Sequence, residues 1–395
     1  MDTANLRPFI RALTCLFTAT LVMMSVSRGD TTKISKKQFQ RCHEALALEP
    51  AAVKAAMELY DGYALSYDAL KEELRLSDQR RSAEQRALQA SKEPSLGEQK
   101  AVNRRAAGDT GREALWELFR KIDLNEQSLF DDLRAILPPG ISEVKIHQME
   151  RLRRRFTVLP DCELRVSRVD VAEVAGPFLE SAAGKPRQVL AEYEESLDVL
   201  LIKHKKYTLD YLKGWASERE LDNGLQVHEI PALKSAAQRM TDSDAAITEL
   251  QMRFVTWIES ELGGENGLKF RDAFHAAADP SLYEASDVDL LLQKAVSSTA
   301  ITEDQRAVFR DIAASHRRTE RPLLEEFFKA RQLLLAAQLK NSLGDFEEYK
   351  KLEAMASNRY VPAEKAIKQH RDDLRAKVRR ELKVAGIPDE PPEKK

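Results

Sequence analysis

The feature that most restricts the fold is the regular spacing of apolar residues over long stretches that lack glycine and proline. From residue 50 to residue 89 the apolar positions recur every three, four or seven residues, at Val53, Met57, Tyr60, Ala64, Tyr67 and Leu74. This spacing places them on one face of an α-helix. Gly62 is the only glycine in the stretch, so the spacing predicts a single helix about 60 Å long.

The same spacing continues along the chain with few breaks, since only 15 glycines and 15 prolines occur among 395 residues. Further helices are expected over residues 110–137, 142–159, 186–220, 231–262, 266–277, 286–297, 302–341 and 362–385. No stretch shows the sustained period-two alternation that would indicate strands. The sequence therefore predicts an all-α fold, an elongated antiparallel helical bundle with coiled-coil-like seams.

Clusters of glycine and proline divide this pattern into parts. Pro160 closes one run of helices, and Gly176, Pro177 and Gly184 mark a less regular stretch after it. The expected parts are a signal peptide (1–27), an N-terminal helical bundle (31–160), an irregular connector (161–185), a C-terminal helical bundle (186–385) and a disordered tail (386–395).

The amino terminus has the three-part pattern of a secretory signal peptide. Arg7 and Arg11 precede the uncharged apolar run from Ala12 to Val26, and Ser27 is a small residue suited to the cleavage position. The run is shorter than the roughly 17–25 residues that span a bilayer as a helix. Cleavage near Ser27 is therefore favoured over retention as an anchor. We expect a periplasmic or secreted protein whose mature chain has no transmembrane segment.

Charge argues against nucleic acid as a partner. The formal net charge is −2, with 62 basic and 64 acidic residues interleaved along the chain, whereas nucleic-acid binding needs a basic excess on one face. The densest basic run consists of Arg151, Arg153, Arg154 and Arg155. These arginines could bind an anionic group or a membrane surface. Pairing with acidic residues of neighbouring helices is the favoured interpretation.

Two cysteines remain after the expected cleavage, Cys42 and Cys162. In an oxidising compartment they could form a disulfide, and the alternative is that they are two small buried side chains in separate helices. Tyr60, Tyr63 and Tyr67 have helical spacing and are expected in the core rather than as a ligand platform.

No local motif for catalysis or cofactor binding is found in the sequence. No pair among the seven histidines has the i,i+4 spacing of a local zinc site, and His204, which lies in an apolar stripe, is expected to be a buried structural residue. A glycine-rich phosphate loop and a serine nucleophile elbow are also missing from the sequence. We therefore predict no catalytic, cofactor-binding or metal-binding residues, while a metal site assembled from distant helices stays open.

Residues 300–305 have the pattern of a corner between two helices. Ile301 precedes the turn, Thr302 is expected to be the N-cap, and Gln305 is expected to reach back to it in a capping box. With Ile301 in place of the leucine, this corner resembles the LTxxQ motif of the periplasmic Spy/CpxP-type stress chaperones and their metal-resistance relatives. The layout also resembles large uncharacterised secreted helical proteins of bacteria with several such corners. The resemblance implies an all-helical periplasmic protein that binds unfolded clients or senses metal-linked stress.

Together these observations favour a non-enzymatic cell-envelope scaffold or chaperone-like protein, since long amphipathic helices suit the binding of protein partners or unfolded clients. One alternative is a metal-linked envelope stress protein. Another is an enzyme of unknown activity with a site between helices. Assembly into a homo-oligomer also stays open.

Overall fold

The structure is a computed structural model, and it describes residues 33–90, 109–137, 141–179, 185–218, 220–223 and 225–386. Every regular element within these ranges is a helix, and none of the described residues lies in a strand. The predicted all-α fold is therefore confirmed. The predicted signal peptide, residues 1–27, lies outside the described residues.

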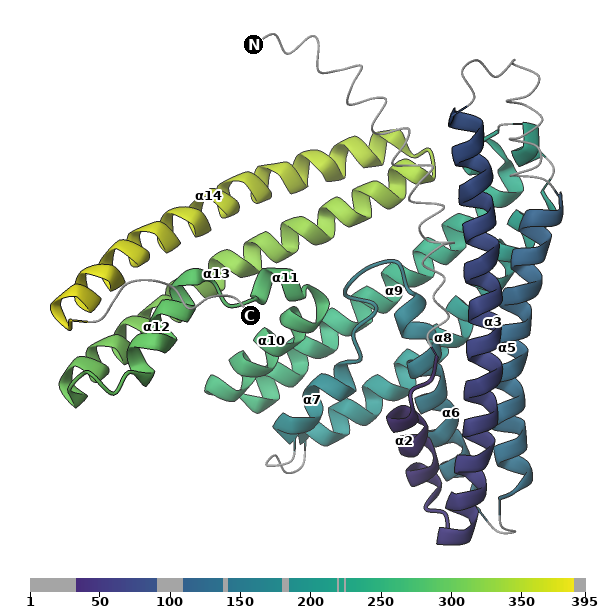
Figure 1. Cartoon of the computed structure of the whole chain (residues 1–395), viewed down its shortest axis with the longest axis horizontal. Coiled ribbons are helices and arrows are strands. Elements are labelled where there is room, and N and C mark those ends of the chain that lie inside the picture. Colours follow the sequence, from purple (N-terminus) through teal and green to yellow (C-terminus); the bar gives the residue numbers. More distant parts are fainter. Residues whose placement is uncertain are drawn as a thin grey trace. The chain divides into compact units, whose positions relative to one another are not determined.

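The chain divides into two compact units (Figure 1). Unit 1 comprises residues 1–263 together with residues 342–344. Its helices are α2 (Lys36–Leu46), α3 (Pro50–Ala90), α5 (Asp109–Ala135), α6 (Glu143–Val158), η1 (Leu159–Asp161), α7 (Val171–Leu179), α8 (Lys185–Ser217), η2 (Glu220–Asn223), η3 (Val227–Glu229) and α9 (Pro231–Leu262).

The core of unit 1 buries the apolar stripes that the sequence shows. Helix α3 packs along α5, and α2 packs against α6, while α8 and α9 lie side by side over most of their length (Figure 1). Tyr60, Tyr63 and Tyr67 of α3 face Phe39 of α2 and Phe130 of α5 in one cluster of buried side chains. Burial of such large aromatic side chains is a major source of stability.

Unit 2 comprises residues 264–341 and 345–395. Its helices are α10 (Gly264–Ala278), α11 (Pro280–Tyr283), α12 (Asp287–Ser297), α13 (Glu303–Ser342) and α14 (Phe346–Val384). One core cluster joins the last three of these helices. It contains Val288, Leu291, Leu292, Ala295, Ile301, Phe309, Ile312, Leu374, Val378 and Leu382.

The last helix differs from its prediction. Helix α14 begins at Phe346, whereas the sequence suggested a start near Pro362, and Pro362 lies inside the helix. An internal proline leaves one carbonyl group without its helical partner, but Pro362 is exposed, so water can satisfy that group. The true start is set by Asp345, whose side chain accepts a hydrogen bond from the Glu348 backbone N–H. The predicted tail falls almost wholly outside the described residues, which end at residue 386.

The boundary between the units also differs from the predicted division. The units separate at Gly263, whereas the expected connector, residues 161–185, lies within unit 1. The described part of this segment packs against α9, because the buried Asp244 carboxylate accepts hydrogen bonds from the backbone N–H groups of Glu163 and Leu164 at 2.6 and 2.8 Å. A segment held in this way is part of a core rather than a linker.

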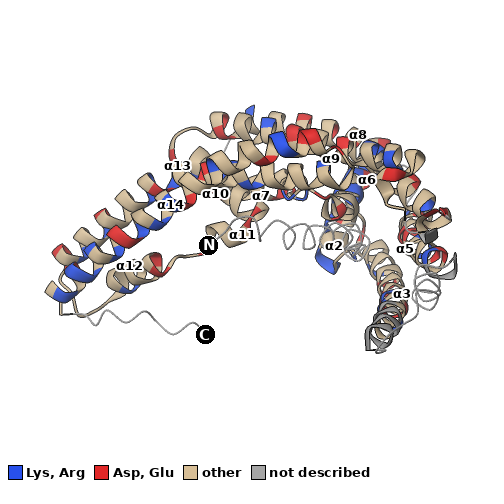
Figure 2. Ribbon diagram, turned by 90° about the horizontal axis from the view of Figure 1, so that it is seen from above, with Lys and Arg blue, Asp and Glu red and all other residues tan. Residues whose placement is uncertain are grey.

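The surface charge follows the expected pattern. Basic and acidic residues alternate along the helices of both units (Figure 2), and many form pairs three or four residues apart, such as Glu72 with Arg75 and Glu265 with Lys269. Within the described ranges, no helix is both long enough and apolar enough to be a membrane-spanning segment.

Candidate metal centre

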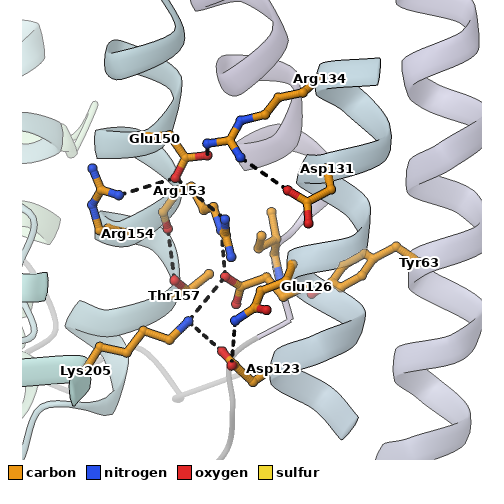
Figure 3. Close-up of polar contacts among 12 residues, drawn as sticks. Tyr63, Asp123, Glu126, Asp131, Arg134, Glu150, Arg153, Arg154, Thr157 and Lys205 are labelled. Carbon is orange, nitrogen blue, oxygen red and sulfur yellow. Dashed lines mark hydrogen bonds and ion pairs between the residues drawn. The ribbon is translucent and has the colours of Figure 1, made fainter. Parts of the chain in front are cut away.

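The arginine run of α6 is engaged by carboxylates, and Figure 3 shows this for Arg153 and Arg154. Arg153 Nε lies 2.9 Å from Glu126 Oε1 of α5, and Arg154 makes two hydrogen bonds, of 2.6 and 2.9 Å, to Asp198 of α8. Arg155, which is 3% exposed, pairs with Asp170 and Glu194. Arg151, at the exposed end, lies 3.3 Å from Glu195.

This arrangement links helix α6 to its neighbours within unit 1. Glu150 of the same helix takes part as well, and its carboxylate accepts from Arg134 of α5 at 2.8 Å (Figure 3). An external anion would have to displace these carboxylates, and removing one partner of a buried ion pair is costly. The geometry therefore matches the favoured interpretation, in which these arginines pair with acidic residues of neighbouring helices.

The two cysteines are both free and buried. Cys42 belongs to the aromatic cluster of unit 1, while Cys162 directly follows η1. Burial raises the pKa of the Cys42 thiol to about 12 and also raises that of Cys162. The structure thus contains two small buried thiols, the interpretation that the sequence offered beside a possible disulfide, and Cys42 and Cys162 are not joined in it.

The corner at residues 301–305 has the predicted geometry. The Gln305 backbone N–H donates to Thr302 Oγ1 at 3.2 Å, and the Thr302 backbone N–H donates to Gln305 Oε1 at 2.9 Å. The capping box is therefore confirmed. Ile301 is 6% exposed and anchors the turn in the core of unit 2. These residues start α13 and so fix the position of the side chains that follow on this helix.

A cluster of possible metal ligands lies one third of the way along α13. His316 and Glu320 are one helical turn apart on α13, and Asp289 approaches them from α12. One donor atom of each residue lies within 4.8 Å of the other two. His316 is 2% exposed and Glu320 is 7% exposed, so two of the three side chains are held inside the helix packing.

The distances around His316 fit coordination of a metal ion. His316 Nε2 lies 3.3 Å from Asp289 Oδ1 and 3.3 Å from Glu320 Oε2. Two ligands of a tetrahedral ion with bonds of about 2.0–2.1 Å are themselves about 3.3 Å apart. The buried Nε2 atom nevertheless lacks the alignment of a hydrogen bond to any described group. A buried nitrogen without a hydrogen bond requires an explanation, and a bound ion is one.

Each carboxylate uses one oxygen for the fold and presents the other to His316. Asp289 Oδ2 accepts hydrogen bonds from the Ser286 backbone N–H at 2.8 Å and from Ser286 Oγ at 2.6 Å, in the capping box that starts α12. Glu320 Oε1 accepts from Arg371 Nε of α14 at 2.5 Å. Oδ1 of Asp289 and Oε2 of Glu320 therefore remain for a ligand between them.

The second ring nitrogen of His316 is held by another histidine. His316 Nδ1 lies 2.9 Å from His370 Nε2 of α14, and the two rings are nearly parallel. Burial lowers the pKa of His370, which favours its neutral form. When His370 Nε2 accepts the proton of His316 Nδ1, the lone pair of His316 Nε2 is directed toward the two carboxylates, as metal ligation requires.

The electrostatics of Asp289 agree with a ligand role. Partial burial opposes ionisation of this carboxyl, but a proton donor or positive charge at the position of His316 Nε2, together with the hydrogen bonds from Ser286, outweighs burial and lowers its pKa. Asp289 is therefore ionised at neutral pH. A deprotonated carboxylate and a neutral imidazole are the forms that bind metal ions.

Part of this centre could have been found from the sequence. His316 and Glu320 have the i,i+4 spacing that places two ligands on one face of a helix, but a search limited to pairs of histidines misses them. Asp289 and His370 lie on other helices, and only the packing of α12 and α14 against α13 brings them to the centre.

Comparisons with known proteins name no relative. No family model matches the sequence, and neither a curated protein nor a solved structure matches it. The resemblance of the Thr302 corner to the LTxxQ motif thus stays a prediction, and the function must be argued from the side chains.

Proposed function

We propose that unit 2 binds one divalent transition-metal ion through Asp289, His316 and Glu320. On this proposal the chain is the metal-linked envelope protein that the sequence suggested as an alternative. The observation that carries it is the buried His316 Nε2 atom, 3.3 Å from a carboxylate oxygen of each acidic residue and without a hydrogen bond. Three helices supply the ligands and the residues that orient them, and such supporting contacts are characteristic of metal sites.

A structural ion pair is the competing explanation. In that case a proton on Nε2 would join His316 to Asp289 and Glu320, and a cation would not be needed. Buried charged hydrogen bonds are normally short, at about 2.7–2.9 Å, and well aligned. Both distances here are 3.3 Å, which fits two ligands of one ion better than a donor and its acceptor.

The ligand set selects the class of ion. One imidazole nitrogen with two carboxylate oxygens favours Zn²⁺ or a similar first-row ion over Mg²⁺ and Ca²⁺, which prefer oxygen ligands alone. Three protein ligands also leave at least one coordination position open. We therefore take Zn²⁺ as the probe ion, with Mg²⁺ as the comparison.

The test is calorimetric titration of Zn²⁺ into the chelator-stripped protein. We expect one bound equivalent with a dissociation constant of about 1 μM or lower, which corresponds to roughly −8 kcal/mol, and no comparable binding of Mg²⁺. Asp289→Asn, Glu320→Gln and His316→Ala should each weaken Zn²⁺ binding by about 100-fold or more, since even second-shell changes cost about 10–100-fold.

The matched control is His147→Ala, because His147 is an exposed histidine in unit 1. This variant should bind Zn²⁺ like the unchanged protein. Binding that survives His316→Ala would place the ion elsewhere, and the absence of any Zn²⁺ binding would leave the structural ion pair as the explanation.

The location of the protein is a separate part of the proposal. Export rests on the sequence pattern of residues 1–27, and mass spectrometry of the protein from its host should find a mature chain that begins at Arg28. An intact amino terminus would remove the envelope location but not the metal site. The predicted role as a scaffold or chaperone-like binder stays a prediction.

A further inference from the structure

A groove lies beside the metal centre in unit 2. It runs between α12 and α13, has a volume of about 610 Å³, and includes Asp289 in its wall. This volume is within the range of roughly 300–1,000 Å³ that is usual for small-molecule sites. Asp289 belongs both to the groove wall and to the proposed ligand set, whereas His316 and Glu320 do not line the groove. The groove therefore meets the proposed metal centre at Asp289.

The groove is lined by both apolar and basic residues. Leu292 and Val296 of α12 and Ala313 and Ala314 of α13 supply apolar surface. The two alanines are small, so the α13 side of the groove stays open. Arg310 and Arg317 of α13 also line it, and they lie two helical turns apart. The helical repeat thus places a strip of apolar surface between two guanidinium groups.

The two arginines differ in how they are paired. Arg310 Nη1 lies 2.8 Å from Glu303 Oε1. Among the residues that the structure describes, none forms an ion pair or hydrogen bond with Arg317. Its charge acts only at longer range on Glu265, whose pKa is lowered mainly by a hydrogen bond from Lys269 and, in smaller part, by Arg321 and Arg317. Arg317 is therefore available to an anion in the groove.

Charge balance points to an anionic ligand. The carboxylates of Asp289 and Glu320 balance a divalent ion, and Arg371, which pairs with Glu320, adds one positive charge. The guanidinium group of Arg317 adds another in the groove wall, and arginine suits carboxylate groups through paired N–H donors. Apart from Asp289, no carboxylate lines the groove.

On the basis of the proposed metal site, we infer that this groove binds an organic carboxylate with an aliphatic chain. The carboxylate group binds the ion at its open coordination position and pairs with the guanidinium group of Arg317. The aliphatic chain packs against Leu292, Val296 and the two alanines. The ligand is thus an amphiphilic anion of the fatty-acid type, and both its head group and its chain contribute to affinity.

The experiment uses the full mature protein, first titrated with Zn²⁺ and then with decanoate or acetate by calorimetry. We expect decanoate to bind the zinc-loaded protein at least about tenfold more tightly than the metal-free protein. Acetate, which has no aliphatic chain, should bind the zinc-loaded protein at least about tenfold more weakly than decanoate does. Tenfold corresponds to about 1.4 kcal/mol, less than the burial of a few methylene groups contributes.

Two pairs of variants locate the ligand. Arg317→Gln should weaken decanoate binding about tenfold or more while Zn²⁺ affinity is unchanged, because a hydrogen bond to a charged group is lost. Arg318→Gln, the exposed neighbour, should have no effect.

Ala314→Phe should fill the groove and also weaken decanoate binding, whereas Ala307→Phe, on an exposed position of the same helix outside the groove, should not.

The outcomes separate the two proposals. If Zn²⁺ does not bind, the proposed function fails, and this inference fails with it at the first titration. If Zn²⁺ binds but decanoate binds equally well without it, or no better than acetate, the metal site stands and the groove has another role. Unchanged decanoate affinity in both Arg317→Gln and Ala314→Phe would likewise overturn the inference.

Discussion

At the scale of the residue, the metal centre depends on which nitrogen of His316 carries the proton. His370 Nε2 lies 2.9 Å from His316 Nδ1, and in the proposed site it accepts the Nδ1 proton, which leaves Nε2 free for the ion. We expect His370→Phe to weaken Zn²⁺ binding by about 10–100-fold, as removal of second-shell partners does. His370→Gln, whose amide oxygen can still accept the proton, should recover part of the affinity in the same calorimetric titration. Equal affinity for all three proteins would show that His370 only packs against His316.

A second histidine predicts how stability depends on pH. His204 is buried, its Nδ1 lies 2.7 Å from Ser243 Oγ, and burial lowers its pKa to about 4. The unfolded chain, with a pKa near 6.5, binds a proton at higher pH than the folded chain. The contribution of neutral His204 to the free energy of unfolding is therefore complete above about pH 6.5. It is lost as the pH falls toward 4, by at most about 3 kcal/mol.

The measurement is chemical denaturation between pH 7 and pH 4. His204→Asn keeps a donor near the position of Nδ1 but does not titrate, so its stability should fall less over this range. Burial also lowers the pKa of His275 to about 4, so the His204→Asn protein should keep part of the dependence of stability on pH. A His275→Asn variant is the matched comparison in unit 2. A His204→Asn protein with the full dependence would contradict this assignment.

At the scale of the element, sequence patterns predicted the helices well where stop signals are strong. The capping box of Thr302 and Gln305 and the glycine after α9 set helix ends that the structure reproduces. The patterns failed at Pro362, because proline is a strong stop only where its missing hydrogen bond cannot be replaced. On an exposed face, the favourable propensity of residues 346–361 and the cap at Asp345 outweigh one proline.

The cost of that proline can be measured. Pro362→Ala restores one backbone donor within α14 and should stabilise unit 2 by about 1–3 kcal/mol, which an upward shift of its thermal unfolding would show. Pro231→Ala is the control, because Pro231 occupies the first turn of α9, where its N–H would have no partner. That substitution should bring no gain. A similar gain at both positions would argue against a specific effect at Pro362.

At the scale of the whole molecule, the sequence yields the fold class but only half of the site. Periodicity indicates helices one at a time, and it places His316 and Glu320 together because they share a helix. It does not show that Asp289 lies beside them, since that contact joins residues 27 positions apart through the packing of α12 on α13. The same limit applies to the division into units, because Asp244 holds the segment after η1 through contacts about 80 residues apart in sequence.

The division into two units leads to a prediction about where the ion acts. Its ligands and supporting residues all belong to unit 2, so the free energy of Zn²⁺ binding should stabilise that unit alone. At 100-fold excess over the dissociation constant the gain is roughly 2.7 kcal/mol. Hydrogen exchange should show slower exchange in peptides from α12, the first half of α13 and α14, and no change in α3, α8 or α9. Asp289→Asn should remove this protection, while protection spread evenly over both units would mean that the ion binds elsewhere or couples them.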